Sequence, residues 1–282
     1  MNKHEIFFLV GANQFLGDLG GLNRIGTKKS LADIDMPSTR GGIGFGYRFR
    51  FHPRFATTTQ LYFGLLAGND ALTEEVIRRS RNLSFRSPLL ELTQKLDIII
   101  YANEKTGARY SIHGLKGARA KADLIYVFTG ISGFYFNPQT KINGKWTNLR
   151  PLRTEGQGLP GGAKPYSNFN FGIPFGIGLR IGISDMWRIG IEASYTKTFT
   201  DYLDDVSTEY YSPTALYANG GANAVYAANP AIENHSWFQE GMQRGNKKDK
   251  DAYFFLNVTV TRNVTYSKMK SAKIRWKGRT KF

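Results

Sequence analysis

The sequence predicts an all-β protein, an eight-stranded antiparallel up-and-down transmembrane β-barrel with long external loops and a basic periplasmic C-terminal tail. Three observations predict this fold. Apolar residues recur at every second position along eight segments, these segments exceed the usual strand of five or six residues, and short and long connections alternate between them. A tilted strand needs roughly 9 to 11 residues to cross the hydrocarbon layer, so the lengths fit a membrane barrel.

The alternation is most regular from Phe169 to Ile183, where every odd position is apolar and most even positions are Gly or Arg. A helix cannot produce a period of two. The same pattern is clear in three other segments and weaker in four. In chain order, we expect strands at residues 5–13, 43–51, 55–66, 90–100, 123–136, 169–183, 187–199 and 254–260.

The connections between these strands favour a barrel with two different ends. His52-Pro53-Arg54 and Ser184-Asp185-Met186 are short enough for hairpin turns. The alternate connections are long, and outer-membrane barrels combine short turns at one end with long loops at the other. These long connections cover residues 14–40, 67–87, 137–168 and 201–250, and residues 102–121 form an exceptional long connection at the short-turn end.

The polar faces of the strands carry charges that are costly in lipid and acceptable inside a barrel when paired. We expect a structural ion-pair network in the lumen, formed by Arg48, Arg50, Glu91, Lys95, Asp97, Arg180, Arg188 and Glu192. Aromatic residues near strand ends are candidates for interfacial girdles: Tyr47, Phe51, Tyr101, Trp187, Phe199 and Tyr253. A soluble lipocalin-like barrel with its apolar faces inward is the alternative, but so many inward glycines alternating with arginines favour the membrane barrel.

The sequence contains no recognisable catalytic or metal-binding motif, so we expect neither an enzyme nor a cofactor. Cys is absent, the four His residues (His4, His52, His113 and His235) lack metal-ligand spacing, and the surroundings of Ser132 do not form a nucleophile elbow. Asp201, Asp204, Asp205 and Glu209 could hold Ca²⁺, but their spacing departs from the EF-hand pattern. We favour a loop clasp, in which these carboxylates cap turns or pair with Arg.

The formal net charge of +16 calls for an anionic partner. Two basic segments meet at the short-turn end, so we divide the chain into a barrel (residues 1–266) and a tail (residues 267–282). The candidate partner-binding residues are Lys105, Arg109, Lys116, Arg119, Lys268, Lys270, Lys273, Arg275, Lys277, Arg279 and Lys281. We expect them to dock an acidic periplasmic protein; the alternatives are binding to anionic lipid head groups and a solvated tail. Nucleic-acid binding through Tyr110 and Trp276 is disfavoured, because much of the charge lies in a connection and a terminal segment instead of being spread over one face of the fold.

No apolar stretch approaches the length of a membrane helix, and no secretory signal is recognisable near Met1. The sequence is therefore expected to be either a cytosolic protein or one whose Met1 begins a processed or recloned mature chain.

Several loop motifs resemble the PorG family, outer-membrane barrels of the type IX secretion system in Bacteroidota. They run in order from Gly17-Asp18 through RNLSFRS (81–87), FNP (136–138), LRTEGQG (152–158) and DYLDDVS (201–207) to RGN (244–246). The resemblance implies a non-enzymatic component of the secretion machinery, located in the outer membrane and associated with a periplasmic ring of PorK and PorN. We expect both termini in the periplasm, contact with outer-membrane lipid and lipopolysaccharide, and no small-molecule substrate.

Two other classes of function remain open from the sequence. The first is a barrel enzyme or lipid-binding protein that acts on lipopolysaccharide, using the loop from Asp201 to Lys250 with Ser132, His235 or the loop carboxylates. The second is a small porin or an adhesin. A filled eight-stranded lumen could not pass a folded cargo protein.

Overall fold

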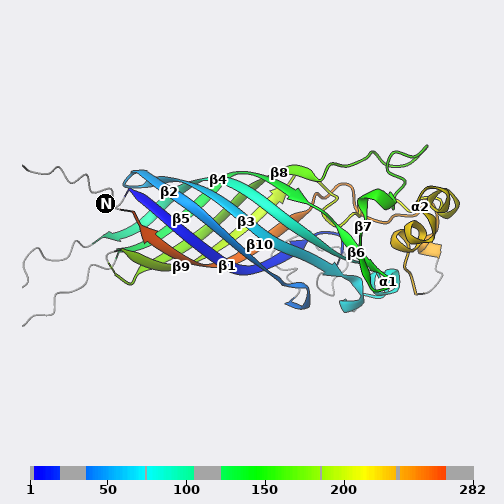
Figure 1. Cartoon of the computed structure of the whole chain (residues 1–282), viewed down its shortest axis with the longest axis horizontal. Coiled ribbons are helices and arrows are strands. Elements are labelled where there is room, and N and C mark those ends of the chain that lie inside the picture. Colours follow the sequence, from blue (N-terminus) through cyan, green and yellow to red (C-terminus); the bar gives the residue numbers. More distant parts are fainter. Residues whose placement is uncertain are drawn as a thin grey trace, which may run out of the picture.

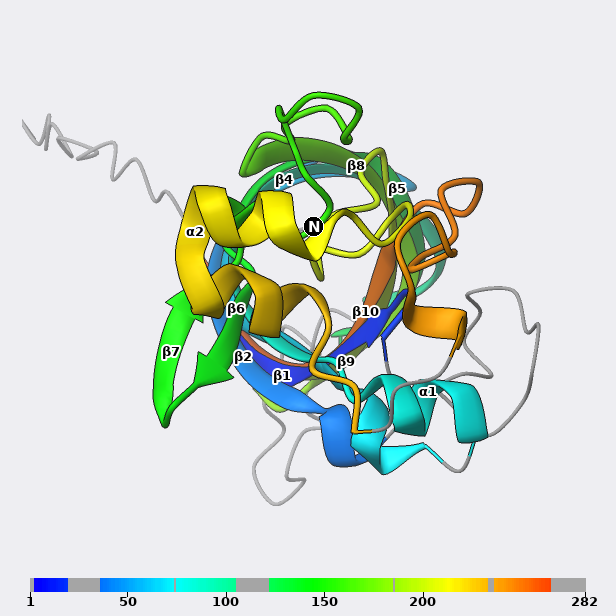
Figure 2. The same cartoon turned by 90° about the vertical axis from the view of Figure 1, so that its right-hand side faces the viewer.

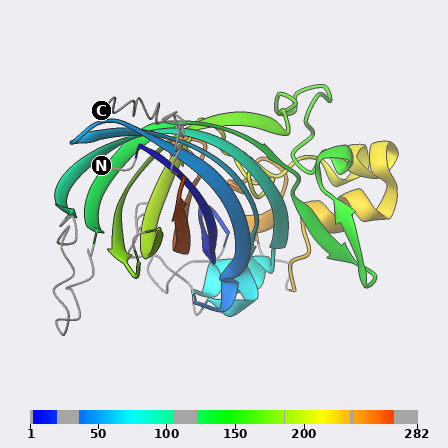
Figure 3. The same ribbon diagram turned by 60° about the vertical axis from the view of Figure 1, so that its left-hand side comes forward.

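Eight long strands close into an antiparallel β-barrel in the computed structural model, which describes residues 3–19, 36–73, 75–104, 122–184, 186–232 and 236–264. Each barrel strand pairs with the next along the chain, and β1 pairs with β10 to complete the ring (Figures 1 and 3). The barrel strands are β1 (His4–Leu16), β2 (Arg40–His52), β3 (Phe55–Asn69), β4 (Ser84–Glu104), β5 (Ala122–Phe136), β8 (Phe169–Gly182), β9 (Trp187–Thr198) and β10 (Ala252–Asn263). The prediction of a closed eight-stranded antiparallel β-barrel is confirmed, with the strands in the predicted order.

The predicted period of two separates the outside of the barrel from its inside. All eight odd-numbered residues from Phe169 to Ile183 point outward and are 40–57% exposed. The even-numbered Arg180 on the same strand is completely buried. Because successive side chains of a strand face opposite sides of the sheet, one apolar surface covers the barrel and a different set of residues fills it.

The interior has an aromatic layer on the side of the long loops. Tyr62 and Phe255 stack with ring centroids 4.6 Å apart, and Tyr253 lies 4.8 Å from Phe255 and 5.8 Å from Phe134. The prediction that Tyr253 belongs to an interfacial girdle is wrong. Its neighbour Phe254 and then Leu256 lie on the outward face of β10, so the pleat turns Tyr253 inward.

Glycine at inward positions makes room for large side chains elsewhere in the lumen. At Gly176 an added Cβ would lie 2.1 Å from the carbonyl oxygen of Ala193 and 2.6 Å from the ring of Phe128. Both distances are far below van der Waals contact, so the strand tolerates only glycine there unless its neighbours move.

The long loops that the structure describes lie at one end of the barrel, opposite the end where β1 begins (Figure 1). Viewed from the loop end, α1, α2 and the β6–β7 hairpin surround the barrel mouth (Figure 2). The loop elements are η2 (Met36–Ser38), η3 (Asp70–Leu72), α1 (Val76–Arg81), β6 (Gln139–Ile142), β7 (Lys145–Asn148), η4 (Arg150–Leu152), α2 (Pro213–Ala228) and η5 (Ser236–Phe238). Neither helix in the described part of the chain has the length and apolar character needed to cross a membrane.

The second long connection is shorter than predicted. The sequence predicts a loop over residues 67–87, but β3 continues to Asn69 and β4 begins at Ser84. Pro88 lies within β4, although proline is normally depleted in paired strands. Here it lies opposite Leu65, and the inward residues Phe85 and Leu89 on either side of it are buried.

Candidate functional site

Glu5 is the carboxylate around which the lumenal cations gather. Its side chain pairs with Arg188, with Arg180 at 3.1 Å and more distantly with Arg48 at 3.9 Å. Glu5 is not among the residues predicted for the network. The signal was available, because Ile6 and Phe8 form the outward face of β1 and Glu5 therefore lies on the inward face.

Two further clusters fill the barrel between Glu5 and the aromatic layer. Lys95 donates to Glu192 at 2.6 Å, and the hydroxyl of Tyr126 donates to the other oxygen of the same carboxylate at 2.7 Å. Arg48 pairs with Asp97 at 2.8 Å while its guanidinium lies 4.1 Å from the centroid of the Tyr126 ring. Tyr126 thus connects the two ion pairs.

The structure places every residue of the predicted lumenal network inside the barrel, each no more than 3% exposed. Two of them have contacts other than those expected. Arg50 donates to the carbonyl oxygen of Pro53 in the first hairpin turn, and Glu91 accepts from the hydroxyl of Tyr253 at 2.9 Å. Because removing one member of a buried pair leaves an uncompensated charge, this network fixes the packing of the lumen.

The loop cap, which we define as the described residues of connections 17–39, 70–83, 137–168 and 199–251, has its own polar core. Arg81, at the end of α1, donates two hydrogen bonds to the carboxylate of Asp70, at 2.7 and 3.1 Å. The same guanidinium donates to the carbonyl oxygens of Asp18 and Arg244, each at 2.8 Å. One side chain therefore ties three of the four connections together.

Arg244 joins the remaining connection to this core. It donates to Glu155 at 3.0 Å, to the carbonyl oxygen of Asp205 at 2.7 Å and to that of Ala228 at 3.2 Å. Glu155 also accepts from the backbone N–H of Ser207 at 2.8 Å. All the loop motifs that carry the family resemblance except FNP (136–138) thus meet at Arg81 and Arg244.

The acidic residues after β9 have partners within the cap. Asp201 accepts from the hydroxyl of Ser207 and Asp204 from the backbone N–H of Val206. Asp205 accepts from Thr154 at 2.5 Å and from Tyr166 at 2.6 Å. Among the described residues, no group of three or more His, Asp or Glu side chains is placed to hold a metal ion.

Burial changes the protonation chemistry of this core. It raises the pKa of Asp205 from 3.8 to about 6, although Arg244 and the hydroxyls of Thr154 and Tyr166 favour the charged form. Burial also raises the pKa of the Tyr166 hydroxyl well above its usual range, and the adjacent Asp205 carboxylate adds to this effect. The cap therefore holds an acid that titrates near pH 6, where an exposed aspartate would already be ionised.

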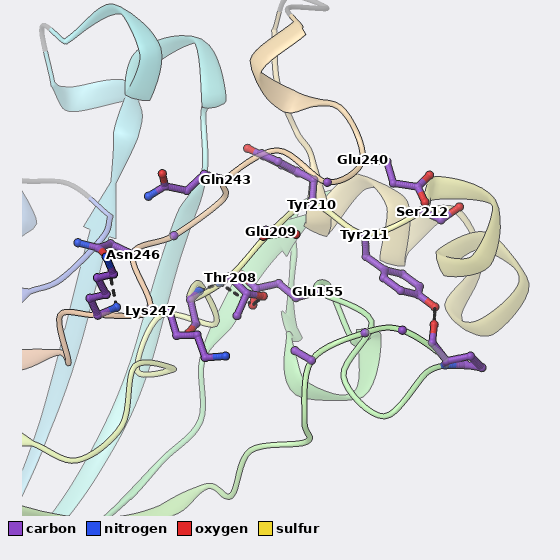
Figure 4. Close-up of a pocket in the computed structure, with 18 residues that line it drawn as sticks. Glu155, Thr208, Glu209, Tyr210, Tyr211, Ser212, Glu240, Gln243, Asn246 and Lys247 are labelled. Atoms are coloured by element: carbon purple, nitrogen blue, oxygen red, sulfur yellow. Dashed lines mark hydrogen bonds between the residues drawn. The ribbon is translucent and has the colours of Figure 1, made fainter.

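An open cleft of about 770 Å³ lies on the cap, between residues 155–163 and residues 207–212 and 240–248 (Figure 4). Tyr211 spans one side of it and donates to the carbonyl oxygen of Pro160 at 2.7 Å. Charges of both signs line the cleft, including Glu209, Glu240 and Lys247. Its walls come from two different connections, and the Arg244–Glu155 pair holds these connections together.

Several residues named in the sequence analysis lie outside the described part of the chain. They include every basic candidate for partner binding, together with Tyr110, Trp276, His113 and His235. Ser132 is described; it lies on β5, faces inward and is 1% exposed, so the barrel wall shields it from substrates. His4 contacts the hydroxyl of Tyr47 at 2.5 Å.

Three solved barrel structures are similar to this chain. Neisserial surface protein A (NspA) shares 5% identity with a TM-score of 0.36, over 94% of this chain and 98% of its own. The N-terminal β-barrel domain of Pseudomonas aeruginosa OprF shares 8% identity with a TM-score of 0.33, over 93% of this chain and 98% of the domain. A major outer membrane protein from Thermus thermophilus shares 11% identity with a TM-score of 0.34, over 92% of this chain and 98% of its own.

No protein of curated function matches the sequence. A family profile does match, and it covers the barrel from β1 to β9 and continues into α2. Over residues 1–226, the chain belongs to the family described as Domain of unknown function (DUF6089).

Proposed function

We propose that this protein is an integral outer-membrane barrel and a non-enzymatic component of a type IX protein secretion machinery. In this proposal both termini lie in the periplasm, and the periplasmic face anchors or stabilises a ring of PorK- and PorN-like proteins. One observation carries the membrane part of the proposal: large apolar side chains are exposed on the outer face of every barrel strand.

This outer surface is far larger than the apolar patches of ordinary soluble proteins. Examples from five of the barrel strands are Phe8, Phe45, Leu92, Ile131 and Ile177, which are 50–69% exposed. The shortest barrel strands have 12 residues, enough to cross a hydrocarbon layer that needs roughly 9 to 11. A lipid environment explains both facts, whereas water would penalise the exposed surface.

The secretion part of the proposal rests on the PorG resemblance. The segments that resemble this family lie on different connections, and the contacts of Arg81 and Arg244 bring all of them except FNP (136–138) together in the cap. If this chain and the PorG family have the same cap structure, the residues that they share should contact one another in the cap. The lumen, meanwhile, is occupied by buried ion pairs and aromatic rings, which supports an anchoring role over conduction of cargo.

The membrane location has a direct test. The purified chain should need detergent or lipid to remain monodisperse, and refolding into vesicles should protect the barrel strands from added protease while the loop cap stays cleavable. A chain that is monodisperse in plain buffer would contradict the proposal.

Anchoring has a separate test in cells. Truncation after Tyr266 removes seven basic residues and should leave the barrel folded while lowering co-purification of the ring proteins. The control replaces Lys247 and Lys248, exposed cations on the opposite end, with Gln and should leave co-purification unchanged. Crosslinking from Lys273 and Lys116 would identify the bound protein. Equal recovery of the ring proteins with full-length and truncated chains would refute docking through the tail.

A further inference from the structure

A groove of about 820 Å³ runs across the outer wall of the barrel, over strands β9, β10, β1, β2, β3 and β4. Strand pairing places it along two neighbouring rows of outward side chains. In one row Phe8 lies opposite Phe45, which lies opposite Leu61. In the other, Ile6 lies between Arg262 and Tyr47 (β10, β1 and β2 are adjacent in Figure 1).

One end of this apolar groove is cationic. Arg262 is exposed, and its guanidinium lies 5.6 Å from the centroid of the Trp187 ring, which also lines the groove. β9 begins and β10 ends here, at the turn end of the barrel. Lys3 and Arg54 are exposed on the same end, so a phosphate group would meet a positive rim.

The chemistry of the groove matches an amphiphile. Arg binds phosphate with charge-assisted and often bidentate hydrogen bonds, while the aromatic and aliphatic walls suit an acyl chain. A second copy of this chain fits less well. Among the described strand residues, the carboxylate that faces outward and could pair with Arg262 of a second copy is Asp123. It lies on β5, which is not one of the groove strands. A contact from Asp123 to Arg262 of another copy would be head-to-tail, which yields open assemblies unless the rotation happens to close a ring.

We infer that this groove binds one anionic phospholipid of the periplasmic leaflet, with an acyl chain along the two rows and the phosphate on Arg262. The inference rests on the proposed membrane location, because only a chain inserted with its turn end in the periplasm exposes Arg262 to that leaflet. One side of the barrel would then hold a specific lipid, in addition to the lipids that surround the whole barrel without specific binding.

Native mass spectrometry of the detergent-purified full chain, titrated with phosphatidylglycerol or phosphatidylcholine, tests the inference. We expect one phosphatidylglycerol to bind at least tenfold more tightly than phosphatidylcholine. Arg262→Gln should remove this preference, while Arg54→Gln, which deletes an exposed cation of the same rim outside the groove, should change it less than twofold.

A second pair of variants tests the acyl-chain part of the site. Ile6→Trp places bulk inside the groove and should weaken phosphatidylglycerol binding at least fivefold. Ile181→Trp adds the same bulk on β8, outside the groove, and should not. Heat-modifiable migration in SDS gels verifies that each variant is folded.

The results separate two kinds of failure. Equal affinity for the two lipids, or equal effects of Arg262→Gln and Arg54→Gln, would overturn the lipid site while leaving the membrane barrel intact. A chain that remains monodisperse without detergent would instead overturn the membrane location and, with it, the lipid site.

Discussion

Replacing Arg244 with Met should lower the free energy needed to open the loop cap and leave the barrel closed. The Arg244 and Glu155 side chains are 1% and 0% exposed, and breaking such a buried pair typically costs about 3–5 kcal/mol. Glu155 would keep its hydrogen bonds from the backbone of Ser207 and from Thr208, so the loss should fall near the lower limit, about 3 kcal/mol. That corresponds to roughly a hundredfold faster hydrogen exchange through cap opening.

Hydrogen–deuterium exchange of the protein in lipid measures this effect segment by segment. Peptides covering residues 152–166 and 201–212 should lose protection, while peptides from β8 and β9 should keep it. Arg78→Met is the matched control, because it removes the same group from a partly exposed pair with Glu75 at 3.6 Å, worth about 0.5 kcal/mol or less. Equal exchange in the two variants would refute the claim that Arg244 locks the cap, and loss of protection in the barrel strands would refute its independence from the barrel.

Three further predictions concern the lumen, the buried acid and an inward glycine. Arg180→Leu removes a 3.1 Å partner of Glu5 and should lower the urea stability of the barrel in vesicles by about 3 kcal/mol, without changing insertion depth measured by lipid-quenching fluorescence. The raised pKa of Asp205 means that the folded cap binds a proton more tightly than the unfolded chain. The stability of the cap should therefore fall by about 3 kcal/mol as the pH rises from about 4 to about 6. Asp205→Asn should abolish this pH dependence in hydrogen-exchange measurements that are corrected for intrinsic exchange rates. Gly176→Ala should cost about 1–3 kcal/mol of barrel stability in urea titrations, whereas Gly41→Ala, with its nearest neighbouring atom 4.0 Å away, should have little effect.

The barrel was predictable from the sequence because its two environments alternate along every strand. Lipid-facing and lumen-facing positions differ in polarity at each step, so a period of two identifies the strands and assigns Arg180 and Glu192 to the interior. The same rule, applied consistently, would have placed Tyr253 inside and added Glu5 to the network. The girdle prediction assigns Tyr253 by residue type, as an aromatic near a strand end, instead of by strand face, and the predicted network does not consider Glu5.

The cap was predictable only as a set of structured loops. Glu155 and Arg244 are 89 positions apart, and no local pattern in either segment identifies the other as its partner. Asp205 illustrates the same limit, because its raised pKa depends on burial created by several connections at once. Loop motifs rich in Gly, Asn and Asp indicate defined turns, but the contacts between loops depend on the barrel holding its strand ends at fixed positions.

The distribution of charge favours the turn end of the barrel as the surface for the protein partner that we propose. Residues 105–121 and 265–282 contain five and seven basic residues and no acidic ones, so they account for twelve of the sixteen net positive charges. The first segment connects the end of β4 to the start of β5, and the second follows β10; all three strand ends lie at the turn end of the barrel. Charges attached at one end orient an approaching anionic surface before any contact forms, and this attraction weakens as salt shortens the Debye length from about 10 Å at 0.1 M to about 3 Å at 1 M. Docking at this end should therefore be lost at high salt, whereas the buried pairs that lock the cap and fill the lumen should persist.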